Sequence, residues 1–240
     1  MDILYWTRLN PDVRIKKVTK RYFNQYYYKL GLHTKCASLL RDPSRPLTTC
    51  IALLKHQRSL NYAGSWGRKF LQVPDISEIN FLERLKILLP QFKDRIKYRI
   101  EDPWLQIYAQ DETVLRDFAA ELDPEFLHHI ETVYMPESDQ TLAVLQQGYT
   151  LRTKENQYAY KFVVKEGRYK REIKRQILAY LQNIGEQVQL PDHFVSNMKR
   201  EYESVWNCYF YSQDKNLSTM LNMMCPTFIA RIEEFYFMPR

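Results

Sequence analysis

Histidines are the residues of this 240-residue chain that are best suited to acid–base or metal chemistry. The five histidines are His33, His56, His128, His129 and His193. The segment HHIE places two of them next to each other, followed by Glu131. Because side chains alternate between the two faces of a strand, only His129 and Glu131 would converge there, and two ligands do not complete a metal site. We therefore predict structural or solvent-exposed roles for the histidines and no metal ion.

Other motifs that carry catalysis or hold a cofactor are missing from the sequence. It contains no nucleophile elbow, Walker loop, HExxH zinc motif or dinucleotide-binding fingerprint. With only six glycines, it has little material for loops that cradle phosphate groups. Asp111 and Glu112 lie where a strand should give way to a helix, so we predict that they cap that helix. The sequence thus predicts no catalytic residue and no cofactor, although a metal-independent endoribonuclease with His33 or His56 as the base stays open as an alternative.

The distribution of charge gives the strongest indication of a ligand. Residues 1–70 contain 14 Lys and Arg but only 3 Asp and Glu, and residues 152–175 contain 9 against 3. Residues 100–139, by contrast, contain 11 acidic residues and one basic residue. Segregated positive charge of this kind attracts phosphate polymers and acidic partners.

The segment NYAGSWGRKF, at residues 61–70, combines glycines with aromatic and basic side chains. Aromatic rings stack on unpaired bases, and cations contact phosphates, so we expect a nucleic-acid-binding loop here. The full set of predicted nucleic-acid-binding residues is Lys16, Lys17, Lys20, Arg21, Tyr27, Lys29, Tyr62, Trp66, Arg68, Lys69, Lys161, Lys170, Arg171, Lys174 and Arg175. A partly buried connecting loop and a solvated helix face remain alternatives for residues 61–70 and 168–184.

An unusual phrase occurs twice, as NQYYYK at residues 24–29 and as NQYAYK at residues 156–161. Further matches follow in the same order in both halves: Lys97 and Lys199, Trp104 and Trp206, Pro124 and Pro226, Tyr134 and Tyr236. We interpret these matches as an internal duplication with halves at residues 1–140 and 141–240. The first half would then carry a basic N-terminal arm and an inserted helix and loop at about residues 34–76.

The same order of secondary structure is expected in each half. The predicted elements are strands 26–32 and 158–164, helices 77–92 and 168–184, strands 95–101 and 198–203, strands 104–109 and 205–211, helices 112–122 and 215–224, and a final strand in each half. Ser77 is the predicted N-cap of its helix, and a further helix is expected at residues 47–60. We expect Tyr26, Tyr28, Tyr158 and Tyr160 to be buried under the helices, which would place Lys29 and Lys161 on the open side of each sheet.

The order β-α-β-β-α-β predicts an α+β protein built from two tandem ferredoxin-like units, with antiparallel sheets and helices on one face. Paired units of this type with a basic surface resemble, in architecture, the CRISPR RNA-processing endoribonucleases. Those enzymes have a glycine-rich loop near the C-terminus, whereas no glycine follows Gly185 here. The resemblance therefore transfers no catalytic residue to this chain.

We predict a non-enzymatic protein that binds single-stranded RNA or DNA through its basic arm and its aromatic and basic loop. The alternative is a protein-interaction or assembly component whose aromatic surface forms a protein interface or mediates self-association. The tyrosine-rich, glycine-poor composition favours a phage or viral source. The sequence shows no signal peptide or membrane span, and its four cysteines form no CxxC pair, so we expect no membrane contact and a cytoplasmic location, in the host cell if the protein is viral.

Overall fold

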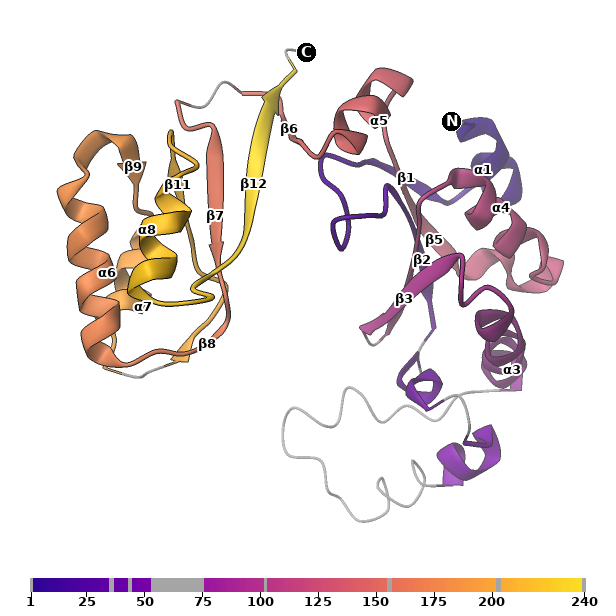
Figure 1. Ribbon diagram of the computed structural model, residues 1–240. Coiled ribbons are helices and arrows are strands. Elements are labelled where there is room, and N and C mark those ends of the chain that lie inside the picture. The colour runs from indigo at the N-terminus through magenta and orange to yellow at the C-terminus, as the bar shows by residue number, and fades with distance from the viewer. Residues whose placement is uncertain are drawn as a thin grey trace. The chain divides into compact units, whose positions relative to one another are not determined.

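The computed structural model describes residues 2–34, 37–42, 45–52, 76–101, 103–154, 157–201 and 204–238. The chain forms two compact units, Met1–Leu142 and Ala143–Arg240 (Figure 1). Each unit contains a mixed sheet of five strands together with helices, so the protein belongs to the α+β class. The four residues Tyr62, Trp66, Arg68 and Lys69 and most of the predicted helix 47–60 lie outside the described residues, although residues 47–52 are helical.

The first unit has a sheet with the strand order β1-β5-β2-β4-β3. Its elements are α1 (Ile3–Leu9), β1 (Arg14–Lys17), β2 (Tyr28–His33), η1 (Ala37–Arg41), α3 (Ile76–Gln91), β3 (Ile96–Glu101), β4 (Trp104–Ala109), α4 (Glu112–Ala120), η2 (Pro124–His129) and β5 (Ile130–Met135). Strand β1 is parallel to β5, and all other neighbouring pairs are antiparallel.

Among the described residues of this unit, helices cover one face of the sheet, and the other face has no helix (Figure 1). Alternation along β2 and β4 turns Leu30, Leu32, Leu105 and Ile107 toward α3 and α4, where they join the buried core. Tyr28 is buried in the same core, as predicted. The residues between them point the other way, so Lys29, Gly31 and His33 of β2 lie beside Trp104, Gln106 and Tyr108 of β4. We call this second face the open face.

The second unit has a sheet with the strand order β6-β12-β7-β11-β9 and a separate pair, β8 and β10. Its elements are α5 (Asp139–Gln146, which spans the boundary between the units), β6 (Thr150–Arg152), β7 (Tyr160–Val164), β8 (Gly167–Arg168), α6 (Arg171–Asn183), η3 (Gly185–Gln187), β9 (Val188–Gln189), α7 (Asp192–Lys199), β10 (Ser204–Val205), β11 (Tyr209–Ser212), α8 (Leu217–Met224) and β12 (Ile229–Phe237). Phe162, Phe210 and Ile177 are buried between this sheet and its helices.

The two sheets share one plan. In each sheet an edge strand, β1 or β6, lies parallel to the last strand of its unit. The first strand of the repeated order then lies between the last and the third, and the second strand forms the far edge. Lys29 is paired with Tyr108 on β4, and Lys161 is paired with Tyr211 on β11. The connection from β2 to α3 is much longer than that from β7 to α6.

Several predictions of local structure are wrong in the second unit. Residues 198 and 199 of the predicted strand 198–203 instead form the end of α7, because Phe194 and Met198, four residues apart, both enter the core. The predicted strand 205–211 is divided into β10 and β11, and Asn207 between them has a φ of 45°. Trp206 therefore lies outside the sheet and is 61% exposed, unlike Trp104 in β4.

Two predictions about helix starts have opposite outcomes. Helix α3 begins at Ile76, so Ser77 lies inside the helix and is not its N-cap. Asp111 does cap α4, because its side chain accepts a hydrogen bond from the backbone N–H of Thr113 at 3.1 Å.

The proposed match of Tyr134 with Tyr236 is not reflected in burial, since Tyr236 is exposed at the end of β12 while Tyr134 is half-buried.

Candidate nucleic-acid interface

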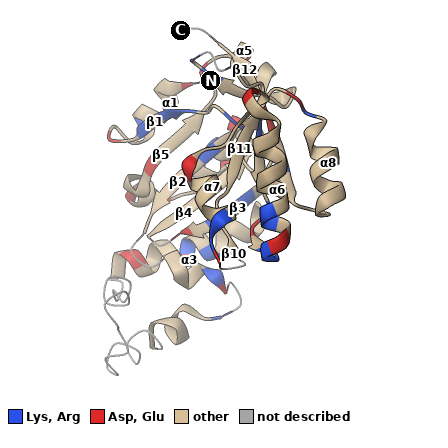
Figure 2. Ribbon diagram, turned by 90° about the vertical axis from the view of Figure 1, so that its left-hand side faces the viewer, with Lys and Arg blue, Asp and Glu red and all other residues tan. Residues whose placement is uncertain are grey.

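A row of alternating lysines and tyrosines crosses the open face of the first unit. Its members, in order across the five strands, are Lys16 on β1, Tyr134 on β5, Lys29 on β2, Tyr108 on β4 and Lys97 on β3. Each residue is the direct cross-strand partner of the next, so the register of four strand pairs creates the row. We call these five residues the lysine–tyrosine row. Figure 2 shows basic residues on β1 and on β3.

The ammonium groups of the row lie close to aromatic rings. Lys29 Nζ is 3.7 Å from the centre of the Tyr134 ring. Lys16 Nζ is 5.3 Å from the same centre and donates a hydrogen bond to the Tyr134 hydroxyl oxygen at 3.4 Å. Lys97 Nζ is 3.9 Å from the centre of the Phe23 ring. Each of these distances is within the range of a cation–π interaction, which stabilises an exposed pair by about 0.5–1 kcal/mol.

A tight turn places two more rings on the row. Tyr22 and Tyr26 exchange backbone hydrogen bonds of 2.8 and 2.9 Å, and the residues between them include Phe23 at φ 50° and Asn24 at φ 63°. Two successive positive φ values are typical of a type I′ turn, for which Asn is well suited. The turn brings the ring centres of Tyr22 and Phe23 to 5.2 and 4.9 Å from that of Tyr108. The phrase NQYYYK therefore encodes the end of this turn and the start of β2.

Burial and neighbouring charges shift the pKa values of side chains in and beside the row. Burial lowers the pKa of Lys29 and raises the pKa values of Tyr22 and Tyr108. Burial also favours the neutral phenol of Tyr134, but the charges of Lys29 and Lys16 outweigh it and hold the pKa of Tyr134 below its usual value. The positive charges of Lys29 and Lys16 thus stabilise the ionised form of Tyr134.

No carboxylate forms an ion pair with Lys16, Lys29 or Lys97 among the residues that the structure describes. Their close partners are aromatic rings, which leave the net positive charge in place. The open face therefore presents three lysines that have no ion-pair partner among the described residues and that lie next to aromatic rings. The Phe23 side chain on this face is 42% exposed. This combination suits a ligand that carries both phosphate groups and aromatic bases.

The residues predicted in the first basic region have different environments. Lys16 and Lys29 belong to the row, whereas the neighbouring Lys17 forms an ion pair with Glu137. Lys20 is exposed and Arg21 is half-buried, just before the turn. Tyr27 packs against the core of the first unit, so its ring is a poor candidate for stacking on a base.

In the second unit, Lys161 lies on the equivalent strand but is balanced by a carboxylate. Lys161 Nζ is 4.0 Å from the centre of the Tyr209 ring and 3.9 Å from Glu233 Oε2. Glu233 also accepts a hydrogen bond from Arg231 at 3.0 Å. The second sheet therefore also has a contact between a lysine and a tyrosine, but here a carboxylate neutralises part of the positive charge.

The predicted binding role of Lys174 is wrong. Lys174 was expected on the solvent side of its helix, but α6 buries Lys174, Ile177, Leu178 and Leu181 together. The Lys174 side chain is 0% exposed, and its Nζ donates a hydrogen bond to the Arg200 carbonyl oxygen at 2.9 Å. Burial lowers its pKa. Of its predicted neighbours, Lys170, Arg171 and Arg175 are exposed, and Arg171 Nη2 lies 3.3 Å from Glu201 Oε1.

The histidines do not form a metal site in the described part of the chain. His129 ends η2 rather than lying in a strand, and its ring stacks on Phe81 at a centre-to-centre distance of 3.9 Å. Its Nδ1 lies 2.7 Å from the His33 carbonyl oxygen, and burial lowers its pKa. Its role is therefore structural, as predicted. His33 itself is on the open face, with Nδ1 3.7 Å from Glu131 Oε1, and His56 lies outside the described residues.

Sequence reasoning missed three members of the row: Lys97, Tyr108 and Tyr134. All three alternate with apolar residues along strands that the sequence predicts correctly, so their side of the sheet was predictable. Their alignment with one another was not, because it depends on the pairing of β3, β4 and β5 with neighbours that are distant in the sequence.

Comparison of the chain with protein-family models, with curated proteins and with solved structures gives no significant match. Within the described ranges, no helix is both long and apolar enough to cross a bilayer. The function must therefore be argued from the open face itself.

Proposed function

We propose that this protein binds single-stranded nucleic acid, RNA or DNA, on the open face of its first unit and that it does so without catalysing a reaction. The observation that carries the proposal is the lysine–tyrosine row, in which three lysines have aromatic rather than acidic partners. Lys16 and Lys97 would contact phosphates from the two sides of the sheet, with Lys29 between them. Phe23 is the exposed ring on which a base would stack.

We also infer that the two units are ferredoxin-like and arose by duplication. The strand orders β5-β2-β4-β3 and β12-β7-β11-β9 support this inference, since both place the first strand between the last and the third. RNA-binding modules with a four-stranded sheet stack bases against aromatic residues on one sheet face. Here a fifth strand extends the first sheet, and Tyr22 and Phe23 cover part of the open face at Tyr108.

The proposal is tested with the triple variant Lys16→Gln, Lys29→Gln and Lys97→Gln and a fluorescent single-stranded oligonucleotide. Each lost phosphate contact should make the log–log salt slope less negative by about 0.7, so the slope should change by up to about 2. The matched control removes three exposed lysines of the second unit, with Lys165→Gln, Lys199→Gln and Lys215→Gln. Equal effects of the two variants would indicate a diffuse basic surface and would contradict the proposal.

Phe23→Ala provides an independent test of base stacking. Stacking releases no counterions, so the affinity should fall by about 1–3 kcal/mol while the salt slope stays unchanged. Wild-type protein that binds no oligonucleotide below about 100 μM in low salt would be weaker than ordinary non-specific binding, and the proposed function would then fail.

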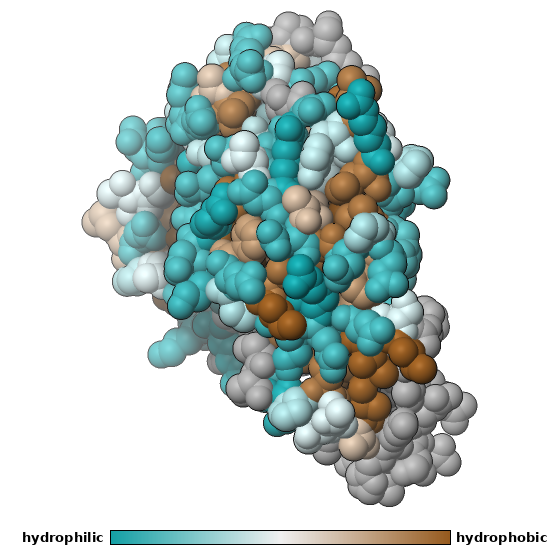
Figure 3. Space-filling model, turned by 90° about the vertical axis from the view of Figure 1, so that its right-hand side faces the viewer, coloured by the Kyte–Doolittle hydropathy of each residue, from teal (hydrophilic) through white to brown (hydrophobic). Residues whose placement is uncertain are grey.

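A protein-interaction or assembly role is the second candidate, and exposed apolar residues favour it. In the second unit, Met223 of α8 is 74% exposed and Met220 and Trp206 are also exposed. In the first unit, Ile76 and Ile87 of α3 are exposed, and Figure 3 shows groups of hydrophobic residues within a largely hydrophilic face. A stoichiometric protein partner, or a dimer in light scattering, together with no bound nucleic acid after purification would favour this role.

A metal-independent endoribonuclease is a third candidate, favoured only by His33, which lies on the open face with Glu131 beside it. Cleavage of a labelled RNA in EDTA by the wild type, but not by His33→Ala, would support it.

A further inference from the structure

Strand β3 forms one edge of the first sheet, and β4 is its single strand neighbour among the described residues. Its side chains alternate in character: Ile96, Tyr98 and Ile100 face the helices, while Lys97, Arg99 and Glu101 face the other way. Tyr98 and Ile100 keep part of their surface exposed, whereas Leu105 and Ile107 on β4 are completely buried. In the described part of the chain η1 packs against β3, but no further strand pairs with its outer side.

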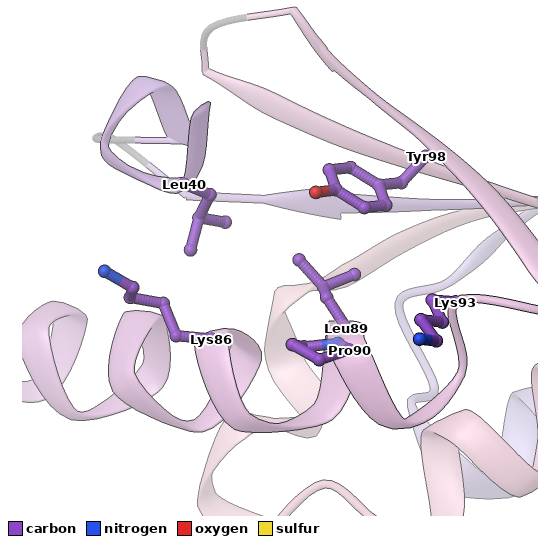
Figure 4. A pocket seen from close by; sticks show the side chains of 6 residues that line it. All are labelled: Leu40, Lys86, Leu89, Pro90, Lys93 and Tyr98. Atoms are coloured by element: carbon purple, nitrogen blue, oxygen red, sulfur yellow. The ribbon is translucent and has the colours of Figure 1, made fainter. Parts of the chain in front are cut away.

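A cavity of about 190 Å³ lies beneath this edge. It is lined by Leu40 of η1, by Lys86, Leu89 and Pro90 of α3, by Lys93 and by Tyr98 of β3. Figure 4 shows Leu40, Leu89 and Tyr98 directed toward a common space, with Lys86 and Lys93 on opposite sides of it. Pockets for whole small-molecule ligands usually measure about 300–1,000 Å³, so this cavity suits a single apolar side chain better than a cofactor.

Basic side chains surround the cavity and the edge. Lys93 and Lys97 are exposed, and neither forms an ion pair within the described ranges. Arg99 pairs with Glu101 at 2.8 Å, and Lys86 donates a hydrogen bond to the Arg45 carbonyl oxygen. A ligand at this edge would therefore meet net positive charge on the side of Lys97 and apolar surface on the side of Tyr98.

We propose that β3 accepts an extended segment of a partner protein as a sixth strand, and that this segment alternates acidic and apolar residues. Backbone hydrogen bonds to an uncovered edge supply affinity, and pockets for alternate side chains supply specificity. The acidic side chains would lie beside Lys97 and Arg99. The apolar ones would continue the surface of Ile96, Tyr98 and Ile100, and one of them, of the size of leucine, would fill the cavity. The cavity lies on the helix-covered side of the sheet, away from the lysine–tyrosine row, although Lys97 belongs to both proposed sites.

The experiment uses the full-length protein and a fluorescein-labelled peptide, Ac-EVELEVE-NH2, in an anisotropy titration. We expect this peptide to bind at least about tenfold more tightly than Ac-EEVLVEE-NH2, which has the same composition without alternation, and than the basic analogue Ac-KVKLKVK-NH2. Replacing the central leucine of the peptide by alanine should weaken binding about tenfold, because the cavity then stays unfilled. Equal affinity for the alternating and the rearranged peptide would overturn the proposal.

Two protein variants locate the site. Lys93→Glu combined with Lys97→Glu should weaken binding of the acidic peptide at least about tenfold, whereas Lys165→Glu combined with Lys199→Glu, two exposed residues of the second unit, should leave it unchanged. Hydrogen exchange should slow at the amides of β3 when the peptide binds, a change that a purely electrostatic surface contact would not produce. Binding that is insensitive to the double variant, or that protects no amide of β3, would contradict the proposal.

Discussion

At the scale of single residues, the open face depends on contacts between charges and rings rather than on ion pairs. Lys29 is half-buried yet has the Tyr134 ring as its closest partner, at 3.7 Å. A carboxylate in that place would have stabilised the lysine and also cancelled its charge. The aromatic partner stabilises the ammonium group and leaves its field available to a ligand.

The pKa of Tyr134 depends on the position of Lys29 and can be used to test it. Because Lys29 and Lys16 hold the pKa of Tyr134 below its ordinary value of 10.0, Lys29→Met should raise that pKa. Spectrophotometric titration of phenolate absorbance should show the shift, and Tyr134→Phe should remove the corresponding transition altogether. An unchanged titration curve in Lys29→Met would mean that Lys29 does not lie over the ring in solution.

Lys174 gives a second test at this scale. Lys174→Met would remove both the desolvation cost of the buried ammonium group and its hydrogen bond to the Arg200 carbonyl oxygen, so the free energy of unfolding should change by no more than about 1 kcal/mol or increase. Lys174→Ala should cost about 2–3 kcal/mol, because it leaves a cavity in the core. Chemical denaturation measures both values.

The pH dependence of Lys174 follows from the direction of its shift. Its pKa in the folded protein lies below the ordinary value of 10.5, so as the pH approaches 10.5 the unfolded chain binds more protons than the folded one. The wild type should therefore gain stability relative to Lys174→Met as the pH rises through this range. A constant difference between the two proteins from pH 7 to pH 10.5 would show that the ammonium group is hydrated.

At the scale of secondary-structure elements, Gly31 allows β2 and β5 to pair closely. A Cβ atom at this position would lie 2.2 Å from Thr132 Oγ1 and 3.2 Å from Gln106 Oε1. Both contacts are on the open face, at the strand positions directly opposite Gly31. The glycine is therefore required by a neighbouring side chain and not by its own backbone conformation.

This explanation predicts a specific rescue. Gly31→Ala should destabilise the protein by about 1–3 kcal/mol through overpacking, as measured by urea denaturation. Thr132→Ala removes the oxygen that clashes, so Gly31→Ala should cost much less in that background. Thr132→Ser keeps the oxygen and should give no rescue. The same cost in all three backgrounds would assign the effect to the strand backbone instead.

The element scale also explains why the second unit departs from the first. Its third strand follows α7 and the short β10, whereas in the first unit β3 and β4 follow each other closely. Met198 and Phe194 have helical spacing, and their burial fixes the segment as a helix. A repeated sequence pattern can thus keep the order of strands while the connections between them change.

At the scale of the whole molecule, the two units should contribute unequally to binding. The first carries the lysine–tyrosine row, whereas in the second Glu233 pairs with both Lys161 and Arg231 and neutralises part of their charge. A fragment of residues 1–142 should therefore retain most of the affinity for a single-stranded oligonucleotide and most of its salt slope. Residues 143–240 should bind at least about tenfold more weakly, because fewer counterions are released.

Circular dichroism and thermal melting of each fragment provide the control, because each fragment contains a sheet and a core of its own. If the two folded fragments bind equally well, the proposed difference between their open faces is wrong.

The sequence by itself determined the local features of this protein. Alternation predicted β2, β3 and β4 within a few residues, helical spacing predicted α3 and α6, and the polar junction at Asp111 predicted the cap of α4. These features depend on neighbours within a few positions of the chain, so one sequence contains the information that they need. The segregation of charge was also readable directly.

The tertiary structure decided which of these residues lie next to one another. Lys16, Lys29 and Lys97 become one row only because four strand pairs have particular registers, and a shift by one residue would turn those side chains to the other face. Lys174 was assigned to the solvent side of α6, but the helix buries a wider surface that includes the lysine, while Ile173 and Tyr180 also pack against the same core. Register and packing depend on residues far away in the chain, which is why the sequence predicted many strands and helices of this protein but not the lysine–tyrosine row.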